Sequence, residues 1–143
     1  METLEQKFAV MERLWAYFFA LDALEDAEGL RSFFTKDALW ECYNHGCDDP
    51  ALRFTSVAEV EAALSAAQAQ NRDVLLKHHL TGLTFDVLNA ERAVTRAKVM
   101  VTIQSSSDPA PRVRNTATCE GEWCRNERGW KLKRWTIRRD PAA

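Results

Sequence analysis

The sequence lacks a hydrophobic run that could cross a membrane. A spanning helix needs about 18 or more consecutive apolar residues, and no segment of the 143 residues reaches that length. A charged start followed by an apolar run and a small-residue cleavage site, which would mark a secretory signal, is also missing. We therefore expect a soluble, cytoplasmic protein that has no membrane among its partners.

An excess of charge of either sign is missing as well. The chain carries 19 basic and 21 acidic residues, a net charge of −2, and its pI is about 5.9. This balance argues against nucleic acid as a partner, because proteins that bind it usually carry a basic excess. The basic cluster KLKRWTIRR at 131–139 is a local exception. Its alternation with apolar residues is typical of a strand with a solvated face, and a binding patch is the alternative.

Ligand spacing typical of structural zinc is not found among the four cysteines. The pairs Cys42 with Cys47 and Cys119 with Cys124 are each five positions apart, whereas zinc ligands commonly pair roughly two to four residues apart. A metal bound by Cys42, His45 and Cys47 is a lesser alternative. We expect no metal and no cofactor, with reduced thiols packed as small hydrophobic side chains.

Repeats and low-complexity segments are absent too, apart from the short stretch SSSDPAP. A hydrophobic content of 46% in 143 residues suits one core. Since a chain of this length has little room for a second core, we expect a single domain over residues 1–143.

A helix with one buried stripe is predicted between Leu4 and Leu24, because apolar residues recur there at intervals of three and four. The stripe consists of Leu4, Phe8, Met11, Trp15 and Phe18. Its next member is Asp22, and a buried carboxylate is unfavourable without a partner. Asp22 either marks the end of the helix at solvent or has a functional partner.

A short second helix and a first strand are predicted next. Leu30, Phe33 and Phe34 would pack inward, a turn would occupy 35–37, and the strand would run through Leu39 and Trp40. A polar loop then covers about 43–54. Ser56 followed by Glu59 is a capping box and opens a third helix. The apolar side of that helix would consist of Val60, Ala63, Leu64 and Ala67.

The remaining sequence divides into four strands near 75–88, 92–105, 112–127 and 129–139. Turn residues separate them, at Asn89, at 105–111 and at 126–129. Helices followed by strands indicate the α+β class, with an antiparallel sheet covered by helices on one face.

Two adjacent histidines lie in the stretch LLKHHLTGLTF at 75–85. Alternation from Leu76 predicts that His78 faces the interior and His79 the other side. The apolar phase changes at Gly82, where a β-bulge would keep both apolar sets on the core face; without the bulge, His79 would face inward. A second change falls near Lys133 and Arg134. Two slipped strands indicate a strongly bent sheet, whose mouth suits a pocket for a small apolar molecule.

Three stretches carry a resemblance to a known family: AYFFALDALEDAEGLRSFFTKDALWE, HHLTGLTF and GWKLKRWTIRRD. With them the whole chain resembles the SnoaL-like branch of the nuclear-transport-factor-2-like superfamily. The resemblance implies a cone-shaped, strongly bent, mostly antiparallel sheet wrapped around N-terminal helices. Polyketide cyclases, scytalone dehydratase, steroid isomerases and bile-acid dehydratases share this frame, as do binding proteins and the small subunits of ring-hydroxylating dioxygenases.

The resemblance also implies catalytic residues. In the dehydratase-like members an aspartate at the end of the first helix faces a histidine early in the following long strand, and these positions match Asp22 and His78. Such a pair would fix the tautomer of the imidazole and raise its basicity. Tyr17 matches a tyrosine of some dehydratases and would be a donor to an enolate, with a core role as the alternative.

Two catalytic groups of scytalone dehydratase are not preserved here. The position of its second histidine falls at Ile103 or Gln104, and that of its asparagine near Cys119 or Glu120. Scytalone dehydration itself is therefore not expected, while a simpler acid-base reaction and plain binding both remain open.

A hydrophobic pocket for a small cyclic molecule is expected around the catalytic pair. Its predicted substrate-binding residues are Phe18, Trp40, Ile103, Cys119, Trp123 and Trp135. The opposite sheet face, with Arg96, Lys98, Glu120 and Glu122, is expected to form a homodimer.

The sequence thus supports three functions. A cofactor-independent lyase or isomerase of the dehydratase or cyclase type is the first. A non-catalytic small-molecule binding or accessory protein, and a small-subunit-like partner of a ring-hydroxylating oxygenase, are the alternatives.

Overall fold

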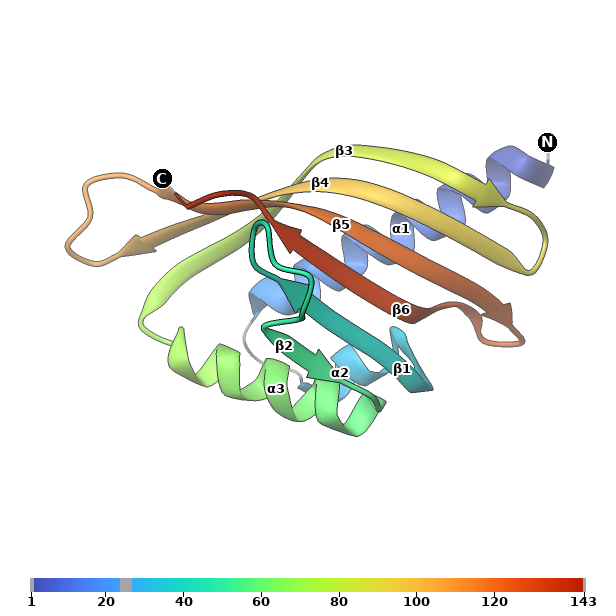
Figure 1. Cartoon of the computed structure of the whole chain (residues 1–143), viewed down its shortest axis with the longest axis horizontal. Helices are drawn as coiled ribbons and strands as arrows, with labels where there is room; N and C mark the ends of the chain where they lie inside the picture. The colour runs from blue at the N-terminus through green and yellow to red at the C-terminus, as the bar shows by residue number, and fades with distance from the viewer. Residues whose placement is uncertain (1, 24–26, 143) are drawn as a thin grey trace.

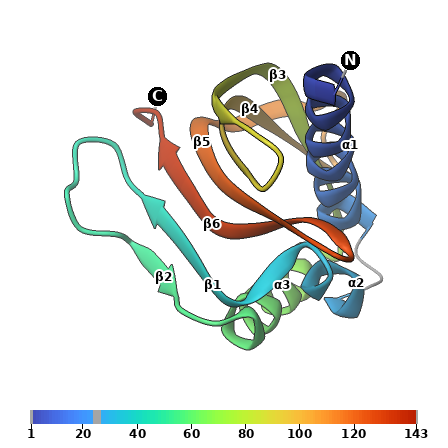
Figure 2. The same cartoon turned by 90° about the vertical axis from the view of Figure 1, so that its right-hand side faces the viewer.

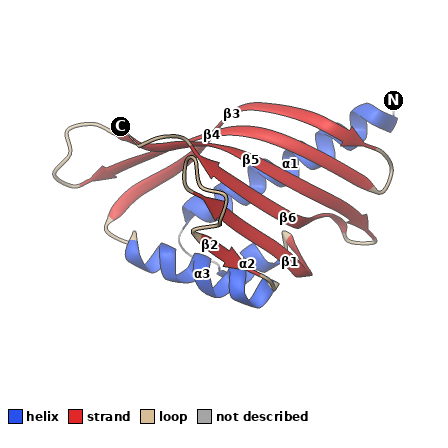
Figure 3. Ribbon diagram, viewed as in Figure 1, coloured by secondary structure: helices blue, strands red, loops and turns tan. Residues whose placement is uncertain are grey.

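One six-stranded sheet with three helices on one side makes up the described part of the computed structural model, residues 2–23 and 27–142 (Figures 1 and 3). The helices are α1 (Glu2–Ala23), α2 (Ala27–Arg31) and α3 (Val57–Gln70). The strands are β1 (Phe34–Tyr43), β2 (Leu52–Phe54), β3 (Val74–Leu88), β4 (Arg92–Ser105), β5 (Arg112–Asn126) and β6 (Gly129–Arg139). No described helix is both long and apolar enough to span a bilayer.

The strands are ordered β2-β1-β6-β5-β4-β3 across the sheet. Every neighbouring pair is antiparallel except β1 and β6, which run parallel. Figure 2 shows how strongly the sheet curves, with α1 along one side and α3 beside β1 and β2. The expected α+β class with a bent, mostly antiparallel sheet is confirmed.

Both predicted changes of strand phase are bulges in the structure. The pairing of β3 with β4 shifts between Leu80 and Gly82, and a second shift follows between Phe85 and Val87. On β6, Leu132 pairs with Trp123 while Arg134 pairs with Glu122, so Lys133 is the extra residue. Bulges increase the local bend of a strand, and these give the sheet its curvature.

The first strand begins earlier than predicted, and the turn expected at 35–37 is wrong. These residues continue β1 from Phe34, and the register against β6 shifts between Phe34 and Leu39. Phe34 before them and Leu39 after them pair with β6, a strand about 100 residues later, so both ends of this stretch are fixed by the sheet; this is a tertiary effect that local turn preference does not contain. The predicted 43–54 loop is also shorter, because β2 pairs with β1 at its end.

The predicted buried stripe of α1 is wrong in phase. Leu4, Phe8 and Trp15 are exposed, while the helix buries a different row against the sheet. That row consists of Gln6, Val10, Leu14, Tyr17 and Phe18. The helix has apolar residues on two neighbouring faces, and Phe18 belongs to both, so spacing alone does not select the face that packs.

The third helix starts where the capping box predicts. The Glu59 backbone N–H donates to Ser56 Oγ at 3.3 Å, and the Glu59 carboxylate accepts the Thr55 backbone N–H at 2.7 Å. Val57 and Val60 are the buried residues of α3, whereas Ala67 is exposed.

Aromatic rings fill the centre of the core between α1 and the sheet. Tyr17 contacts four other rings, those of Phe18, Phe33, Phe34 and Trp135, at centroid distances of 5.4–5.8 Å. All five are at most 6% exposed. This cluster ties α1 to the first residues of β1 and to β6, and so fixes where α1 ends.

Candidate active site

Asp22 lies in the last turn of α1, next to the final helical residue. The end of this helix is held by α3, because the Gln68 amide donates to the carbonyl oxygens of Ala20 and Leu21 at 3.5 and 3.4 Å. These carbonyls would otherwise lack intrahelical partners. The contact fixes the turn that carries the Asp22 carboxylate.

The Asp22 carboxylate binds His78 in two ways. It accepts a hydrogen bond from His78 Nδ1 at 2.7 Å, and it accepts the His78 backbone N–H at 3.1 and 3.2 Å from its two oxygens. β3 is the last strand of the sheet, so its outward N–H groups have no neighbouring strand. One carboxylate therefore fixes both the backbone and the ring of His78.

This contact leaves the second ring nitrogen of His78 available. A carboxylate only accepts hydrogen bonds, so Nδ1 carries the proton toward Asp22 and Nε2 of the neutral ring keeps a lone pair. Nε2 makes no hydrogen bond with any residue that the structure describes. The His78 and Asp22 side chains are 21% and 22% exposed, so the pair is in contact with solvent. The arrangement suits a general base.

The two histidines lie on opposite faces of β3. The His78 ring stacks on Phe18 of the core, whereas His79 Nε2 lies 2.8 Å from Thr102 Oγ1 on the neighbouring strand. The bulge at Gly82 agrees with this placement. The prediction that His78 faces inward is therefore confirmed by the geometry, and its catalytic role stays a prediction.

Tyr17 lies in the core and is one ring removed from His78. Phe18 is in contact with both, and no hydrogen bond joins Tyr17 to the Asp22–His78 pair within the described parts of the chain. Burial raises the pKa of the Tyr17 phenol well above its usual range, and the nearby Trp40 side chain opposes part of this rise. The phenol thus stays protonated, but the structure does not bring it to Asp22 and His78.

The predicted substrate-binding residues lie at different distances from the pair. Phe18 stacks on His78 and contacts Trp135, and Ile103 pairs with Leu76 on the same side of the sheet. Trp40 and Cys119 are buried in the core. Burial raises the pKa of the Cys119 thiol to about 12, so it remains neutral and is no nucleophile.

Trp123 lies near the opposite end of the strands. It pairs with Ala93 on β4, eight residues from Val101, the partner of His78. At about 3.3 Å per residue this separation is roughly 26 Å. The Trp123 indole donates to Thr95 Oγ1 at 2.9 Å inside the core. Trp123 therefore does not line a site at His78.

No group of three or more histidine, cysteine or acidic side chains that could hold a metal ion occurs in the described residues. Cys42 is buried, whereas His45 and Cys47 are exposed. The three side chains singled out as a lesser alternative for a metal therefore do not converge.

A buried charge cluster was missed by sequence reasoning. Glu41 is 3% exposed, accepts hydrogen bonds from Tyr43 and Arg134 at 2.9 and 2.8 Å, and lies 3.9 Å from Arg53. Burial alone would raise the pKa of Glu41, but these partners bring it below its ordinary value. The sequence signal for this cluster is an acidic residue, Glu41, between the apolar Trp40 and Cys42, but its partner Arg134 is 93 residues away in the chain.

The family model of the SnoaL-like domain matches residues 2–136. The chain belongs to this family. A search of curated proteins finds no match to this SnoaL-like protein. Its fold is nevertheless shared by many solved structures.

Three solved structures illustrate the similarity of this SnoaL-like protein. A nuclear-transport-factor-2-like protein with a cystatin-like fold from Novosphingobium aromaticivorans is 18% identical, with a TM-score of 0.80 over 98% of this chain and 85% of that one. A proposed scytalone dehydratase from the same organism is 17% identical (TM-score 0.78, 96% and 86%). The beta subunit of a proposed aromatic-ring-hydroxylating dioxygenase, also from it, is 16% identical (TM-score 0.77, 98% and 92%). At these identities the comparison shows the fold alone.

Proposed function

We propose that this SnoaL-like protein is a cofactor-independent lyase or isomerase of the dehydratase or cyclase type. The proposal is carried by the 2.7 Å contact between Asp22 and His78 Nδ1, which leaves Nε2 as an unpaired base. The substrate we infer is a small, hydrophobic, cyclic hydroxy-ketone. Three apolar residues support this choice: Phe18 stacks on His78, Trp135 contacts Phe18, and Ile103 lies on β4 two residues from Val101, the partner of His78.

The reaction would begin with proton transfer from carbon. His78 Nε2 takes a proton from the carbon next to the substrate carbonyl, and the electron pair of that C–H bond forms an enolate. Asp22 stabilises the resulting imidazolium, because a carboxylate beside a charged ring favours the protonated form.

The second step returns the same proton. As the enolate collapses, a carbon–carbon double bond forms and the bond to the β-hydroxyl breaks. The imidazolium donates its Nε2 proton to the leaving oxygen, so water departs and His78 is neutral again. In a substrate with a β,γ carbon–carbon double bond instead of a β-hydroxyl, the enolate is conjugated, and return of the proton to the γ carbon would give isomerisation. Tyr17 was expected to donate to the enolate, and in this structure that role requires its phenol to move out of the core.

The homodimer remains part of this proposal. On the outer sheet face Glu120 pairs in register with Arg96 on β4, and Glu122 with Arg134 on β6. Opposite charges in rows can pair with a second copy related by two-fold symmetry. The four free cysteines support a reducing compartment such as the cytoplasm.

Binding without chemistry is the second candidate. It is favoured by the position that matches the second histidine of scytalone dehydratase, which is Ile103 or Gln104 in this chain. Neither is a histidine, so the acid-base pair has no second imidazole to assist it. The similarity to a dioxygenase beta subunit adds an accessory role as a third candidate. Co-elution with an oxygenase large subunit would identify that role.

The experiment tests a panel of cyclic β-hydroxy-ketones as substrates. Loss of water is monitored through the ultraviolet absorbance of the conjugated product. We expect turnover by the parent protein, a loss of about 10²–10⁴-fold in His78→Ala, and parent activity in the matched control His79→Ala. Equal rates in parent and His78→Ala would refute the proposal. Binding of the ketones without turnover by the parent would favour the second candidate.

A further inference from the structure

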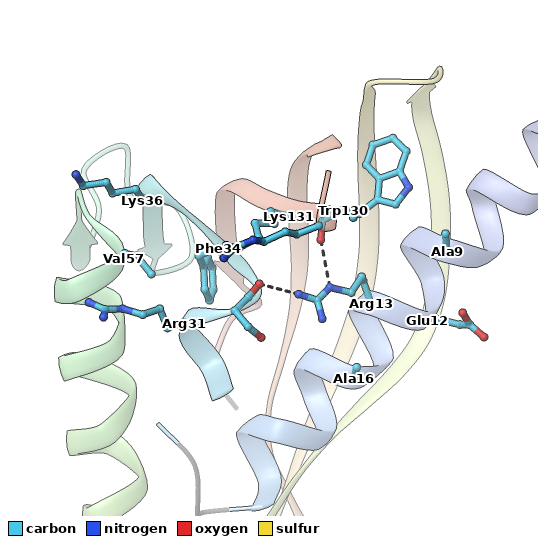
Figure 4. A pocket seen from close by; sticks show the side chains of 13 residues that line it. Ala9, Glu12, Arg13, Ala16, Arg31, Phe34, Lys36, Val57, Trp130 and Lys131 are labelled. Atoms are coloured by element: carbon cyan, nitrogen blue, oxygen red, sulfur yellow. Dashed lines mark hydrogen bonds between the residues drawn. The ribbon is translucent and has the colours of Figure 1, made fainter. Parts of the chain in front are cut away.

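An open groove of about 1030 Å³ lies beside the middle of α1 (Figure 4). It is bounded by the middle of α1, the residues around α2 and the start of β1, and the turn between β5 and β6. Neither Asp22 nor His78 lines it. Its apolar lining comes from Ala9, Ala16, Phe34, Val57 and Trp130.

The strand register places the Lys131 side of this groove far from Asp22 and His78, whereas Ala16 on its nearer side lies six residues before Asp22 on α1, roughly 9 Å at about 1.5 Å per residue. Lys131 at the groove pairs with Cys124, which pairs with Arg92, whereas His78 pairs with Val101. Arg92 and Val101 are nine residues apart on β4, which is roughly 30 Å at about 3.3 Å per residue. A molecule at the Lys131 side of the groove would therefore not touch the imidazole of His78.

Basic side chains are concentrated in the groove, although the net charge of the chain is −2. Arg13, Lys36, Arg128 and Lys131 line it, and none of the four forms an ion pair with a described residue. Arg31, a fifth cation, is neutralised by Glu61 at 2.9 Å. Glu12 is the carboxylate of the lining, and Figure 4 shows it pointing away from Arg13.

Arg13 is held in a fixed orientation without a counter-ion. Its Nη2 donates to the Ser32 carbonyl at 2.7 Å, its Nε donates to the Trp130 carbonyl at 3.2 Å, and its guanidinium lies 4.3 Å from the centroid of the Phe33 ring. Partial burial lowers its pKa. Half-buried cations usually pair with carboxylates, and here two neutral carbonyls leave both the charge and the Nη1 donors unmatched.

We propose that this groove binds an organic anion with a flat apolar body, of the aromatic carboxylate or sulfonate class. The apolar lining would bury the ring, while the unpaired cations would surround the anionic group. Because Arg13 is already oriented, little side-chain freedom is lost on binding. The site is independent of the function proposed for Asp22 and His78.

The test uses 2-naphthoate as the anion and 2-naphthamide as its neutral counterpart. Binding is followed by nitrogen–proton correlation spectra of the full chain, with the amides of Ser32 and Gly129 reporting on the groove and that of His78 on the catalytic pair. We expect naphthoate to shift the groove signals and naphthamide to bind at least about tenfold more weakly. Salt at about 1 M, which shortens the screening length to roughly 3 Å, should remove most of this difference.

Matched charge variants test whether naphthoate binding depends on the cations of the groove. Substitution of Arg13 could disturb the fold, so Lys36→Gln and Arg128→Gln, which are exposed, are combined with Lys131→Gln, which is half-buried. We expect about tenfold weaker naphthoate binding. The control combines Arg72→Gln, Lys77→Gln and Lys98→Gln, which removes equal charge outside the groove and should leave affinity at the parent value. Equal losses in both triple variants, or loss of binding in His78→Ala alone, would overturn the proposal.

Discussion

The rings of Phe18 and His78 stack with an interplanar angle of 3° and centroids 5.9 Å apart. Phe18 comes from the buried row of α1, and His78 comes from β3 just before its first bulge. The stacking fixes the plane of the imidazole, while Asp22 fixes its rotation within that plane. Phe18 and Asp22, both on α1, therefore orient the proposed base. The position of α1 on the sheet determines the orientation of the His78 ring.

Replacement of Asp22 by asparagine should weaken both the fold and the chemistry. The amide can accept only through one oxygen, so the His78 backbone and ring lose their shared ionic partner. We expect about 1–2 kcal/mol of lost unfolding free energy in urea titrations. The imidazole should also lose its preferred tautomer, which nitrogen chemical shifts of the ring report. Unchanged ring shifts would contradict the assigned hydrogen bond.

The observed phase of α1 predicts opposite results for two apolar residues. Leu14 is fully buried and Phe8 is 53% exposed. Leu14→Ala should cost about 2–5 kcal/mol of unfolding free energy because it leaves a cavity, whereas Phe8→Ala should change it by less than about 0.5 kcal/mol. Urea denaturation of the two variants measures both values. A larger loss of unfolding free energy in Phe8→Ala than in Leu14→Ala would contradict the observed phase and support the buried stripe predicted from spacing.

Cysteine reactivity should follow burial. Cys47 is exposed and Cys124 is partly exposed, whereas Cys42 and Cys119 are buried. Burial raises the pKa values of the Cys42 and Cys119 thiols, that of Cys119 to about 12, so neither forms appreciable thiolate at neutral pH. A thiol-disulfide reagent at pH 8 should label Cys47 first, Cys124 more slowly, and the other two only after unfolding. Mass spectrometry of peptides identifies the order, and rapid labelling of Cys119 would contradict this packing.

Glu41 should make stability depend on acid pH. Its pKa in the folded chain lies below the ordinary value of 4.5, so the carboxylate stabilises the fold above that value and the contribution is lost as pH falls through the folded pKa. Glu41→Gln should therefore be less stable than the parent at pH 7, by about 1–3 kcal/mol, and the difference should shrink below pH 4.5. Thermal melts across this range measure it. Glu59→Gln at the exposed cap is the comparison, and a difference that does not shrink in acid would contradict the ion-pair account.

The strands and their bulges were predictable because each depends on local pattern. Period-two alternation marked the four long strands, and a glycine at 82 marked the first change of phase. The phase of α1 was not predictable, since Phe8 and Val10 are both apolar and only the sheet selects between their faces. The extension of β1 through 35–37 depends on the residues at either end, Phe34 and Leu39, which pair with β6, a strand distant in the chain.

Part of the candidate site was also predictable from local sequence pattern, and part depends on tertiary structure. Asp22 and His78 follow from the end of a helix and the alternation of one strand, and the structure brings them together. The core placement of Tyr17 and the distance of Trp123 depend on how the sheet bends and registers, which spacing within one segment does not contain. The groove around Arg13 joins residues from α1, the start of β1 and the β5–β6 turn. Of these, Lys131 belongs to the basic cluster for which a binding patch was the alternative.

The hydrogen bond from the His78 backbone to Asp22 also matters for association between chains. An exposed edge strand offers unpaired N–H and C=O groups on which a strand of another molecule can add, which is a common start of aggregation. At His78 that position is occupied by the end of α1 and its negative charge. Asp22 thus protects the sheet from strand addition by other molecules, and selection can retain it for colloidal stability as well as for the proposed chemistry.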